Sequence, residues 1–473
     1  MNFQQNFTMT IANEPAITAG TLAIINPHTG VAFAHAPDAG AAELDRAIAA
    51  ARQAQPPWRA TPLSARCDAV MGLAAALESH AGEFARLLTR EQGKAGVEAA
   101  GEIGSCIRWL RETAQHALAD DELAAGAIQA TGVTTQRVPL GVVAAIAPWN
   151  FPLLLGVWKV APALVTGNTM VLKPSPFTPL TSLKFGELAR AILPAGVLNV
   201  ISGGDALGPL VTSHPGFDKI AFTGSTATGR AVLRSASANL TRVTLELGGN
   251  DPAIVMPDID LDTVVPRLFS AAFRNAGQFC VAAKRMYVHR TIYDAFRERF
   301  VAFAKSRVVG DGSDPATHVG PVQNAVQFGR LRELIDDCAA NGYTFALGGP
   351  FTPGTGYHVP LTILDNPPDT SRPVAEEAFG PVLPLLAFDT IDEVVARANA
   401  TEYGLAASIW CRDPVTAAAI ASRLAAGTVW INTVHDLSPM RPFAGHKQSG
   451  FGVENGREGL HEYTAPRVVV AAA

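Results

Sequence analysis

The chain has 473 residues, of which 48% are apolar and 17% are charged, and its formal net charge at pH 7 is −5. This length exceeds what one hydrophobic core usually organises, and the apolar share excludes a disordered chain, so we expect two or three packed units. The 37 basic and 42 acidic residues are interspersed, which argues against the basic patch that nucleic-acid binding requires.

The N-terminus and the cysteines indicate the compartment. Residues Met1–Ala16 show neither the basic start and apolar stretch of a secretory signal nor an Arg-rich amphipathic pattern. The five cysteines are odd in number, widely spaced and without a C-x-x-C pair, which argues against a disulfide framework and a zinc site. We therefore expect a cytoplasmic protein without a bound metal.

Helices are expected first along the chain. Between Ala41 and Gly93 apolar residues recur near helical spacing. The run Val138–Trp158 carries no charge and is as long as a membrane span. It contains three prolines, which would interrupt a spanning helix. We therefore predict a buried strand followed by a turn, and no membrane association.

Short apolar runs then alternate with helical stretches, which is typical of a largely parallel α/β sheet. The first series is Val142–Ala147, Met170–Leu172, Leu198–Ile201, Ile220–Phe222, Val243–Leu245 and Ile254–Met256. A second series, Met286–Val288, Val382–Phe388, Ala407–Trp410 and Val429–Ile431, indicates a second α/β unit. The apolar tail Val468–Ala473 is strand-like and should pair with another strand, with a second subunit as one candidate.

Three residue types could carry chemistry. Cys280 follows Gly277 and a helical stretch, Leu261–Ala276, and the glycine would let a substrate approach the backbone. A single cysteine is more often a buried structural thiol. Glu246 ends a strand, where α/β sheets place ligands, although a glutamate beside two glycines is more often a solvated charge. Asn150, held in Pro148–Pro152, either satisfies backbone groups or donates to a developing oxyanion.

Two further segments have the form of nucleotide-binding turns. Gly224 and Ser225 lie where a strand ends and a helix begins, which suits a phosphate but equally suits a tight turn. Lys173 and Ser175 close another strand, so the lysine either reaches a ribose or faces solvent.

Taken together, these segments resemble the aldehyde dehydrogenase superfamily over nearly the whole chain. The matching motifs, at family-like intervals, are PWNFP at 148, KPS at 173, FTGST at 222, ELGGN at 246, GQ-x-C at 277, EE-x-FGP at 376 and PF-x-G-x-K-x-SG at 442. The resemblance implies an NAD(P)-dependent enzyme of the hydrolytic, non-acylating branch, which oxidises an aldehyde to a carboxylic acid.

The resemblance also implies catalytic roles. Cys280 matches the nucleophile, Glu246 the base that activates water, and Asn150 the oxyanion donor. Lys159 and Glu454 match a pair that relays protons from the base, although a structural ion pair explains them equally well.

For the coenzyme, NAD with NADP as a possibility, the resemblance implies contacts along the whole dinucleotide. The residues are Trp149, Lys173 and Ser175 at the adenosine half, Gly224 and Ser225 at the pyrophosphate, and Glu377 and Phe379 at the nicotinamide ribose. Pro176 stands where many NAD-preferring members carry an acid, which puts the coenzyme preference in question. Ala444 replaces a common glycine.

The implied substrate tunnel is apolar. Its residues are Phe151, Leu155, Trp158, Phe279, Val281, Leu437 and Phe443. Such a pocket favours aromatic or medium-chain aliphatic aldehydes and leaves a second carboxylate unpaired. Arg441 near the rim keeps a semialdehyde as the alternative, although a surface role is expected for both Arg441 and His435.

The resemblance implies a Rossmann-like coenzyme domain over 1–120 and 140–246, and an α/β catalytic domain over 247–448. A small β oligomerisation arm over 121–139 and 449–473 would support a homodimer or homotetramer. A coenzyme A-acylating dehydrogenase is the nearest rival, and Glu246 counts against it. A non-catalytic binding protein of this fold need not keep thiol, amide and carboxylate together.

Overall fold

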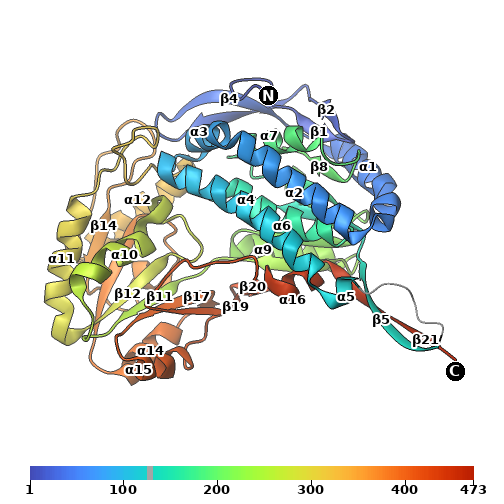
Figure 1. Cartoon of the computed structure of the whole chain (residues 1–473). Helices are drawn as coiled ribbons and strands as arrows, with labels where there is room; N and C mark the ends of the chain where they lie inside the picture. Colours follow the sequence, from blue (N-terminus) through green and yellow to red (C-terminus); the bar gives the residue numbers. More distant parts are fainter. Residues whose placement is uncertain (125–130, 473) are drawn as a thin grey trace.

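The computed structural model describes residues 1–124 and 131–472. Two large, mostly parallel β-sheets organise the molecule, one in each half, with helices packed over them (Figure 1). The α/β class is thereby confirmed. No helix in the described part of the chain is long and apolar enough to cross a membrane.

The first sheet contains the earlier series of predicted strands except Ile254–Met256. Its spatial order is β2 (Glu14–Ala16), β1 (Met9–Ile11), β8 (Leu198–Val200), β7 (Thr169–Lys173), β6 (Val142–Ile146), β9 (Lys219–Thr223), β10 (Arg242–Glu246) and β20 (Gly450–Phe451). The strands from β8 to β10 run parallel, and the outer strands β1, β2 and β20 are antiparallel. Parallel strands therefore end together at one edge, which is where a ligand site is expected.

Helices cover this sheet, and their apolar faces form its core. They are α1 (Ala41–Ala60), α2 (Leu63–Ser79), α3 (Ala81–Gln92), α4 (Gly96–Leu118), α6 (Pro152–Val165), α7 (Leu180–Ala189), α8 (Leu207–Ser213) and α9 (Thr226–Ser237). The prediction for Val138–Trp158 was incomplete, because α6 begins there at Pro152 after the strand and turn. Since α6 is buried almost all round, it lacks the amphipathic period that marks a surface helix.

The second sheet has the spatial order β13 (Phe345–Leu347), β14 (Thr362–Asp365), β15 (Val382–Phe388), β12 (Ala283–His289), β11 (Asp251–Val255), β17 (Ala406–Trp410) and β18 (Thr428–Ile431). The grouping of Ile254–Met256 with the first series was wrong, because β11 pairs with β12 and β17 at the centre of this sheet. The sequence of a fully buried strand does not indicate which sheet the strand joins. The helices here are α10 (Leu261–Phe273), α11 (Tyr293–Lys305), α12 (Ala325–Ala340), α13 (Arg372–Ala375), α14 (Ile391–Asn399) and α15 (Pro414–Ala421).

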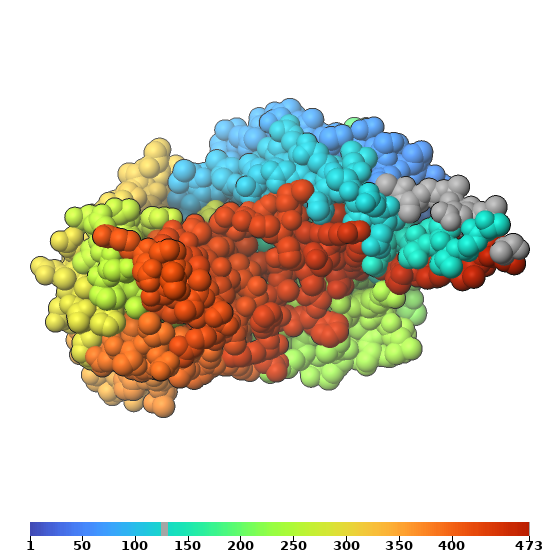
Figure 2. Space-filling view, turned by 60° about the horizontal axis from the view of Figure 1, so that its bottom comes forward, coloured from blue at the N-terminus to red at the C-terminus, as the bar shows by residue number. Residues whose placement is uncertain are grey.

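A two-stranded arm projects from the body (Figures 1 and 2). It consists of β5 (Gly132–Pro139) and β21 (Thr464–Ala471), which pair antiparallel along their full length. The expected partner of the apolar tail is therefore a strand of the same chain, and Ala473 lies outside the described residues.

The remaining short elements connect these units. They are β3 (Thr21–Asn26), β4 (Val31–Pro37), α5 (Asp121–Ala124), the 3-10 turns η1 (Arg274–Gly277) and η2 (Arg290–Ile292), β16 (Tyr403–Gly404), β19 (His446–Lys447) and α16 (Gly456–His461).

Candidate active site

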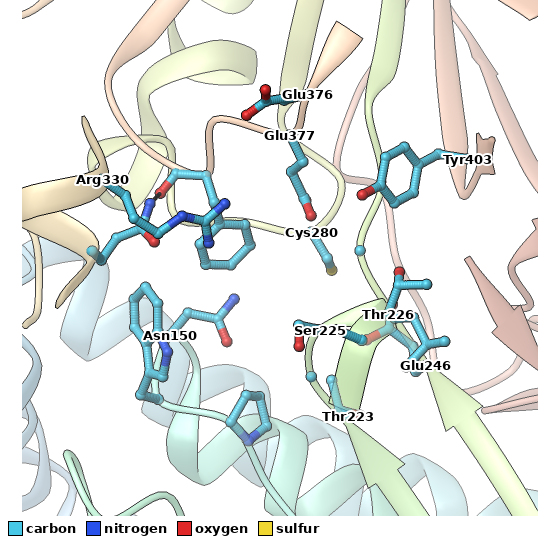
Figure 3. Close-up of a pocket in the computed structure, with 18 of the residues that line it drawn as sticks. Asn150, Thr223, Ser225, Thr226, Glu246, Cys280, Arg330, Glu376, Glu377 and Tyr403 are labelled. Carbon is cyan, nitrogen blue, oxygen red and sulfur yellow. Dashed lines mark hydrogen bonds between the residues drawn. The ribbon is translucent and has the colours of Figure 1, made fainter. Parts of the chain in front are cut away.

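A cavity of about 430 Å³ lies where the two sheets meet (Figure 3). The first unit contributes residues 148–150, Leu155 and the ends of β9 and β10. The second contributes Cys280, side chains of α12 and the loop 375–379. Residues that are far apart in the sequence therefore face one space, with Asn150 and Cys280 on its two sides.

Glu246 is the last residue of β10, and its side chain is buried in the cavity wall. Neither carboxylate oxygen has a hydrogen-bond partner among the described residues. Burial raises the pKa of this carboxyl to about 8, while the nearby Lys159 acts in the opposite direction. A carboxyl with a pKa near neutrality can both accept and return a proton. The solvated loop charge considered from the sequence is excluded.

Cys280 is half-buried, whereas the other four cysteines are buried. It follows η1, where Asn275 and Ala276 both adopt positive φ angles, 51° and 55°. Gly277 has a φ of 71°, and a Cβ there would lie 2.3 Å from the carbonyl oxygen of Gly380. The glycine therefore admits this carbonyl, not a substrate as we expected. The turn holds the thiol at the cavity surface.

The surroundings of Cys280 favour the neutral thiol. Burial is the larger effect and the charge of Glu246 the smaller, and together they raise the pKa of the thiol well above its ordinary value. Lys284 acts in the opposite direction. Its ammonium donates to the Cys280 carbonyl oxygen at 2.5 Å and forms an ion pair with Glu377 at 3.1 Å. The thiol is thus neutral at rest and needs a proton acceptor beside it.

Asn150 lies in the loop between β6 and α6 and is buried. Its side-chain nitrogen donates to the carbonyl oxygen of Gln278 at 3.1 Å. The backbone carbonyl oxygen of Asn150 accepts hydrogen bonds from the Lys94 ammonium at 2.9 Å and from the Asn275 side-chain amide at 3.0 Å. The amide therefore satisfies a backbone group, as one of the two alternatives from the sequence has it, and its nitrogen carries a second N–H.

Lys159 and Glu454 form a buried ion pair of 2.8 Å, and Lys159 also donates to Thr223 at 2.7 Å. Because Thr223 lines the cavity and Lys159 does not, the pair lies behind the cavity wall. The second oxygen of Glu454 is buried without a partner among the described residues.

The proposed pyrophosphate residues lie at the start of α9. Gly224, Ser225, Thr226 and Ala227 all line the cavity, and the Ser225 hydroxyl accepts from the Thr228 N–H at 3.3 Å. The first N–H groups of a helix have no intrahelical partner and suit an anion.

The opposite wall has an aromatic corner and a carboxylate. Trp149 and Phe379 make an edge-to-face contact of 5.3 Å, and both line the cavity. Glu377 accepts from the Gly249 N–H at 3.1 Å. Gln327 donates to the carbonyl oxygens of Ala378 and Phe379 at 2.9 and 3.0 Å and so fixes this loop.

Lys173, Ser175 and Pro176 do not line this cavity. They lie at the end of β7, whose Lys173 is in register with Ile146 of β6. Burial lowers the pKa of Lys173 to about 8, and the charges of Asp205 and Asp38 oppose this shift.

Four of the predicted tunnel residues, Phe151, Phe279, Trp158 and Phe443, pack as two ring pairs, which we call the aromatic wall. Among the predicted tunnel residues, Leu155 alone lines the described cavity. The other contacts are a tilted Phe151–Phe279 pair at 4.6 Å, a Trp158–Phe443 edge contact at 5.6 Å, a Val281 carbonyl that accepts from His435 at 3.1 Å and a Leu437 carbonyl that accepts from Arg108 at 2.9 Å.

Two polar residues near this wall differ in position. Arg441 is exposed and paired with Asp436 at 2.6 Å, so it does not face the pocket as a free cation. His435 packs on Phe279 with ring centroids 4.6 Å apart, which corrects the surface position we expected. Burial, with the charge of Arg274, lowers the pKa of His435 to about 3, so the ring is neutral.

Sequence reasoning missed several cavity residues. These are Thr223, Thr226, Gln327, Arg330, Glu376, Glu402 and Tyr403. Glu376 stood in the EE-x-FGP motif and could have been named. Gln327 and Arg330 lie on one face of α12, a helix without any motif of its own.

Comparisons with known proteins agree with this geometry. Residues 16–469 match the model of the aldehyde dehydrogenase family. A phenylacetaldehyde dehydrogenase of Pseudomonas fluorescens is 41% identical, with 96% of this chain and 93% of the relative covered. The solved aldehyde dehydrogenase of Bacillus cereus superimposes with a TM-score of 0.95 at 35% identity, covering 99% of this chain and 96% of the other. Betaine aldehyde dehydrogenase of Staphylococcus aureus, solved with NAD+, gives 0.93 at 33% identity over 98% and 94%.

A parallel α/β fold with a thiol and a buried carboxylate lining one cavity beside the carboxyl ends of its strands is typical of a dehydrogenase. The chain belongs to the aldehyde dehydrogenase family. It is an NAD(P)-dependent enzyme that oxidises aldehydes to carboxylic acids.

Proposed function

We propose that this enzyme oxidises an aromatic or medium-chain aliphatic aldehyde through a thioester on Cys280. The observation that carries the proposal is that the half-buried Cys280 and the buried, unpartnered Glu246 line the same cavity. A structural thiol would need neither cavity nor carboxylate.

The cavity fits a dinucleotide. The start of α9 offers N–H groups to a pyrophosphate, Glu377 offers oxygens to a ribose, and the edge-to-face pair Trp149 and Phe379 offers ring surface. Bound NAD+ supplies the acceptor for the hydride that leaves the substrate carbon. Lys173, Ser175 and Pro176, at the end of β7, would hold the adenosine half.

The steps on this chain follow from the positions of three groups. The Cys280 thiol releases its proton to water in the cavity, and its sulfur bonds to the aldehyde carbon. The free N–H of Asn150 donates to the resulting oxyanion. After oxidation the carbon is a thioester on Cys280. Glu246 then takes a proton from water, the hydroxide adds to the thioester, and the acid leaves as the thiol is restored.

Lys159 and Glu454 are assigned to moving that proton away from Glu246. Their ion pair of 2.8 Å is buried and acts on the Glu246 carboxyl.

Glu246 also argues against a coenzyme A-acylating enzyme, which has no use for a base that activates water. Pairing of Arg441 with Asp436 argues against that arginine as a clamp for a semialdehyde.

The substrate class rests on the aromatic wall of Phe151, Trp158, Phe279 and Phe443. Such rings bury apolar surface, worth roughly 25 cal/mol per Å². Mixing the enzyme with NAD+ and benzaldehyde, and following absorbance at 340 nm, tests the function. No NADH from benzaldehyde, phenylacetaldehyde or hexanal would contradict it.

For coenzyme choice we propose NAD with measurable use of NADP, since Pro176 offers neither an acceptor to a ribose nor repulsion to a phosphate.

We also propose a coenzyme-binding domain over 1–120 and 140–246, a catalytic domain over 247–448 and an oligomerisation arm from 121–139 and 449–473. Supporting this, among the described strands β5 and β21 pair with each other and with no third strand, and Val133, Val468 and Val470 on the arm are exposed. Exposed apolar side chains on an edge strand favour a partner, so a homodimer or homotetramer is proposed. Sedimentation of the protein with Val468→Lys tests this.

Five unbridged cysteines favour a reducing compartment such as the cytoplasm.

A further inference from the structure

Lys284 is the second residue of β12, and its side chain is buried. Its ammonium donates to the backbone carbonyl oxygen of Cys280 at 2.5 Å and lies 3.1 Å from Oε1 of Glu377. Figure 3 shows the Glu377 side chain pointing toward Cys280, and both residues line the cavity. One buried cation therefore contacts both the residue that reacts with the aldehyde and the carboxylate that we assign to the coenzyme.

The contacts of Glu377 leave one of its oxygens for a ligand. Oε1 accepts from the Gly249 N–H at 3.1 Å and forms the ion pair with Lys284. Oε2 takes part in neither contact and lies against Gly248, where a Cβ would occupy its place. A carboxylate with one oxygen held in this way presents the other at a defined position, which suits a ribose hydroxyl. Without Lys284, the Gly249 N–H would be the one hydrogen bond from a described residue that orients this side chain.

Three carboxyls and one ammonium act on the Cys280 thiol. Burial and the three carboxyls raise the pKa of this thiol, whereas the charge of Lys284 lowers it. The carboxyls belong to Glu246 on β10, Asp251 on β11 and Glu377 in the loop before β15. Burial raises the pKa of Glu246 to about 8 and that of Asp251 to about 7, so both negative charges grow as the pH rises through neutrality. Lys284 is thus the member of this set that stabilises a thiolate.

Two other buried cations nearby are engaged elsewhere. Arg285, the next residue of β12, donates to the carbonyl oxygen of Asn250 at 2.8 Å. Lys159 forms its ion pair with Glu454 at 2.8 Å. Neither contacts the backbone of Cys280, as Lys284 does.

We propose that Lys284 is a positioning residue that links the coenzyme to the nucleophile: its ammonium fixes Glu377 for the nicotinamide ribose, and its charge stabilises the Cys280 thiolate that attacks the aldehyde. This inference rests on the proposed function and adds a residue to that same site. Lys284 acts through Glu377 and Cys280 and touches neither substrate nor coenzyme.

The alternative is that Lys284 only satisfies the Cys280 carbonyl and so supports the fold of the turn. A supporting role would lower stability without a specific effect on thiol ionisation, and its effect on coenzyme binding would not depend on Glu377. Two measurements that need no aldehyde separate these roles.

The first measurement is alkylation by iodoacetamide in the absence of coenzyme, which reports the Cys280 thiolate because the other four cysteines are buried. Lys284→Met keeps an unbranched side chain and removes the charge, which moves the thiol titration to higher pH. Alkylation should therefore be about tenfold slower than in the wild type at each pH from 7 to 9, the effect of one pH unit. Lys284→Arg keeps the charge and should stay within about threefold of the wild type. Cys280→Ser gives the background rate.

The second measurement is the Kd for NAD+, from quenching of protein fluorescence. Lys284→Met should raise it about fivefold, because Glu377 loses one of its two contacts. Glu377→Gln should raise the Kd at least as much. The double variant should equal Glu377→Gln alone, since Lys284 reaches the coenzyme through that carboxylate. Effects that add in the double variant would assign Lys284 to general support of the fold.

Lys184→Met is the matched control, since Lys184 is also buried and is paired with Glu187 at 2.7 Å on α7. Its alkylation rate and Kd for NAD+ should equal those of the wild type. A wild-type alkylation rate in Lys284→Met, or additive effects in the double variant, would overturn the proposal.

Glu377→Gln tests the charge balance with Lys284 in place, so the proposal is decided even if Lys284→Met does not fold. Removal of this carboxylate should speed alkylation of the coenzyme-free enzyme about threefold, and an unchanged or slower rate would overturn the proposal. Failure of the proposed function has a different signature, because the wild type would then yield no NADH from benzaldehyde, phenylacetaldehyde or hexanal.

Discussion

The clearest test of the division of labour in the cavity is Glu246→Gln. This change keeps the size of the side chain and removes its ability to accept a proton. Formation of the thioester should survive and its hydrolysis should slow by roughly 10² to 10⁴-fold, the usual contribution of a general base. We therefore expect about one equivalent of NADH per Cys280 in a rapid phase, followed by a slow steady state.

The pKa of Glu246 gives this prediction a second, quantitative part. Burial raises it to about 8, so the carboxylate needed as base is present above that pH and is lost as the pH falls. About 91% is ionised at pH 9 but only about 1% at pH 6, since each unit changes the ratio tenfold. If hydrolysis limits turnover, kcat in the wild type should fall about 90-fold across this range, and Glu246→Gln should lose this dependence.

Stopped-flow absorbance at 340 nm, recorded from pH 6 to 9, measures both phases at once. Glu393→Gln, which removes an acid on the distant helix α14, serves as the control and should match the wild type. If the rapid phase disappears together with the steady state, Glu246 also takes the proton from Cys280 before attack. A pH profile in Glu246→Gln that still follows a group near 8 would refute the assignment of that group.

Three further changes test the remaining assignments. Cys280→Ser should abolish NADH formation and keep coenzyme binding, measured by quenching of protein fluorescence, because a hydroxyl lacks the acidity needed for attack; near-normal turnover would disprove the mechanism. Lys159→Met should leave the rapid phase intact and slow the steady state severalfold, and equal loss of both phases would make the pair with Glu454 structural. Pro176→Glu should reduce kcat/KM with NADP relative to NAD; if the parent already rejects NADP a thousandfold, about 4 kcal/mol, another residue sets the choice.

The sequence predicted most of the strands because buried parallel strands are short apolar runs between helices. It did not predict which sheet each strand joins, as β11 shows: its residues are as apolar as those of β10, and only the pairing with β12 and β17 separates them. Helix α6 was missed for a related reason, since burial on every side removes the period that marks a helix.

Site residues that stand in family motifs were predicted from the sequence, and site residues outside such motifs were missed. Glu246, Cys280 and Asn150 stand in motifs and line one cavity. Lys284 had no motif, yet it contacts the Cys280 carbonyl and pairs with Glu377. Arg274, the first residue of η1, stands in no motif, and only the structure shows that it lies over the Phe151 and Phe279 rings.

The length of the C-terminal segment is more constrained than that of most terminal tails. Within a short stretch, β20 pairs beside Glu246, Glu454 binds Lys159, and β21 forms half of the arm. These features lie on one continuous segment, so inserting or deleting a residue between Phe451 and Thr464 would shift the arm against the catalytic cavity. Within this C-terminal segment, insertions and deletions should therefore be tolerated only beyond Ala471, after the last described pairing of β21 with β5.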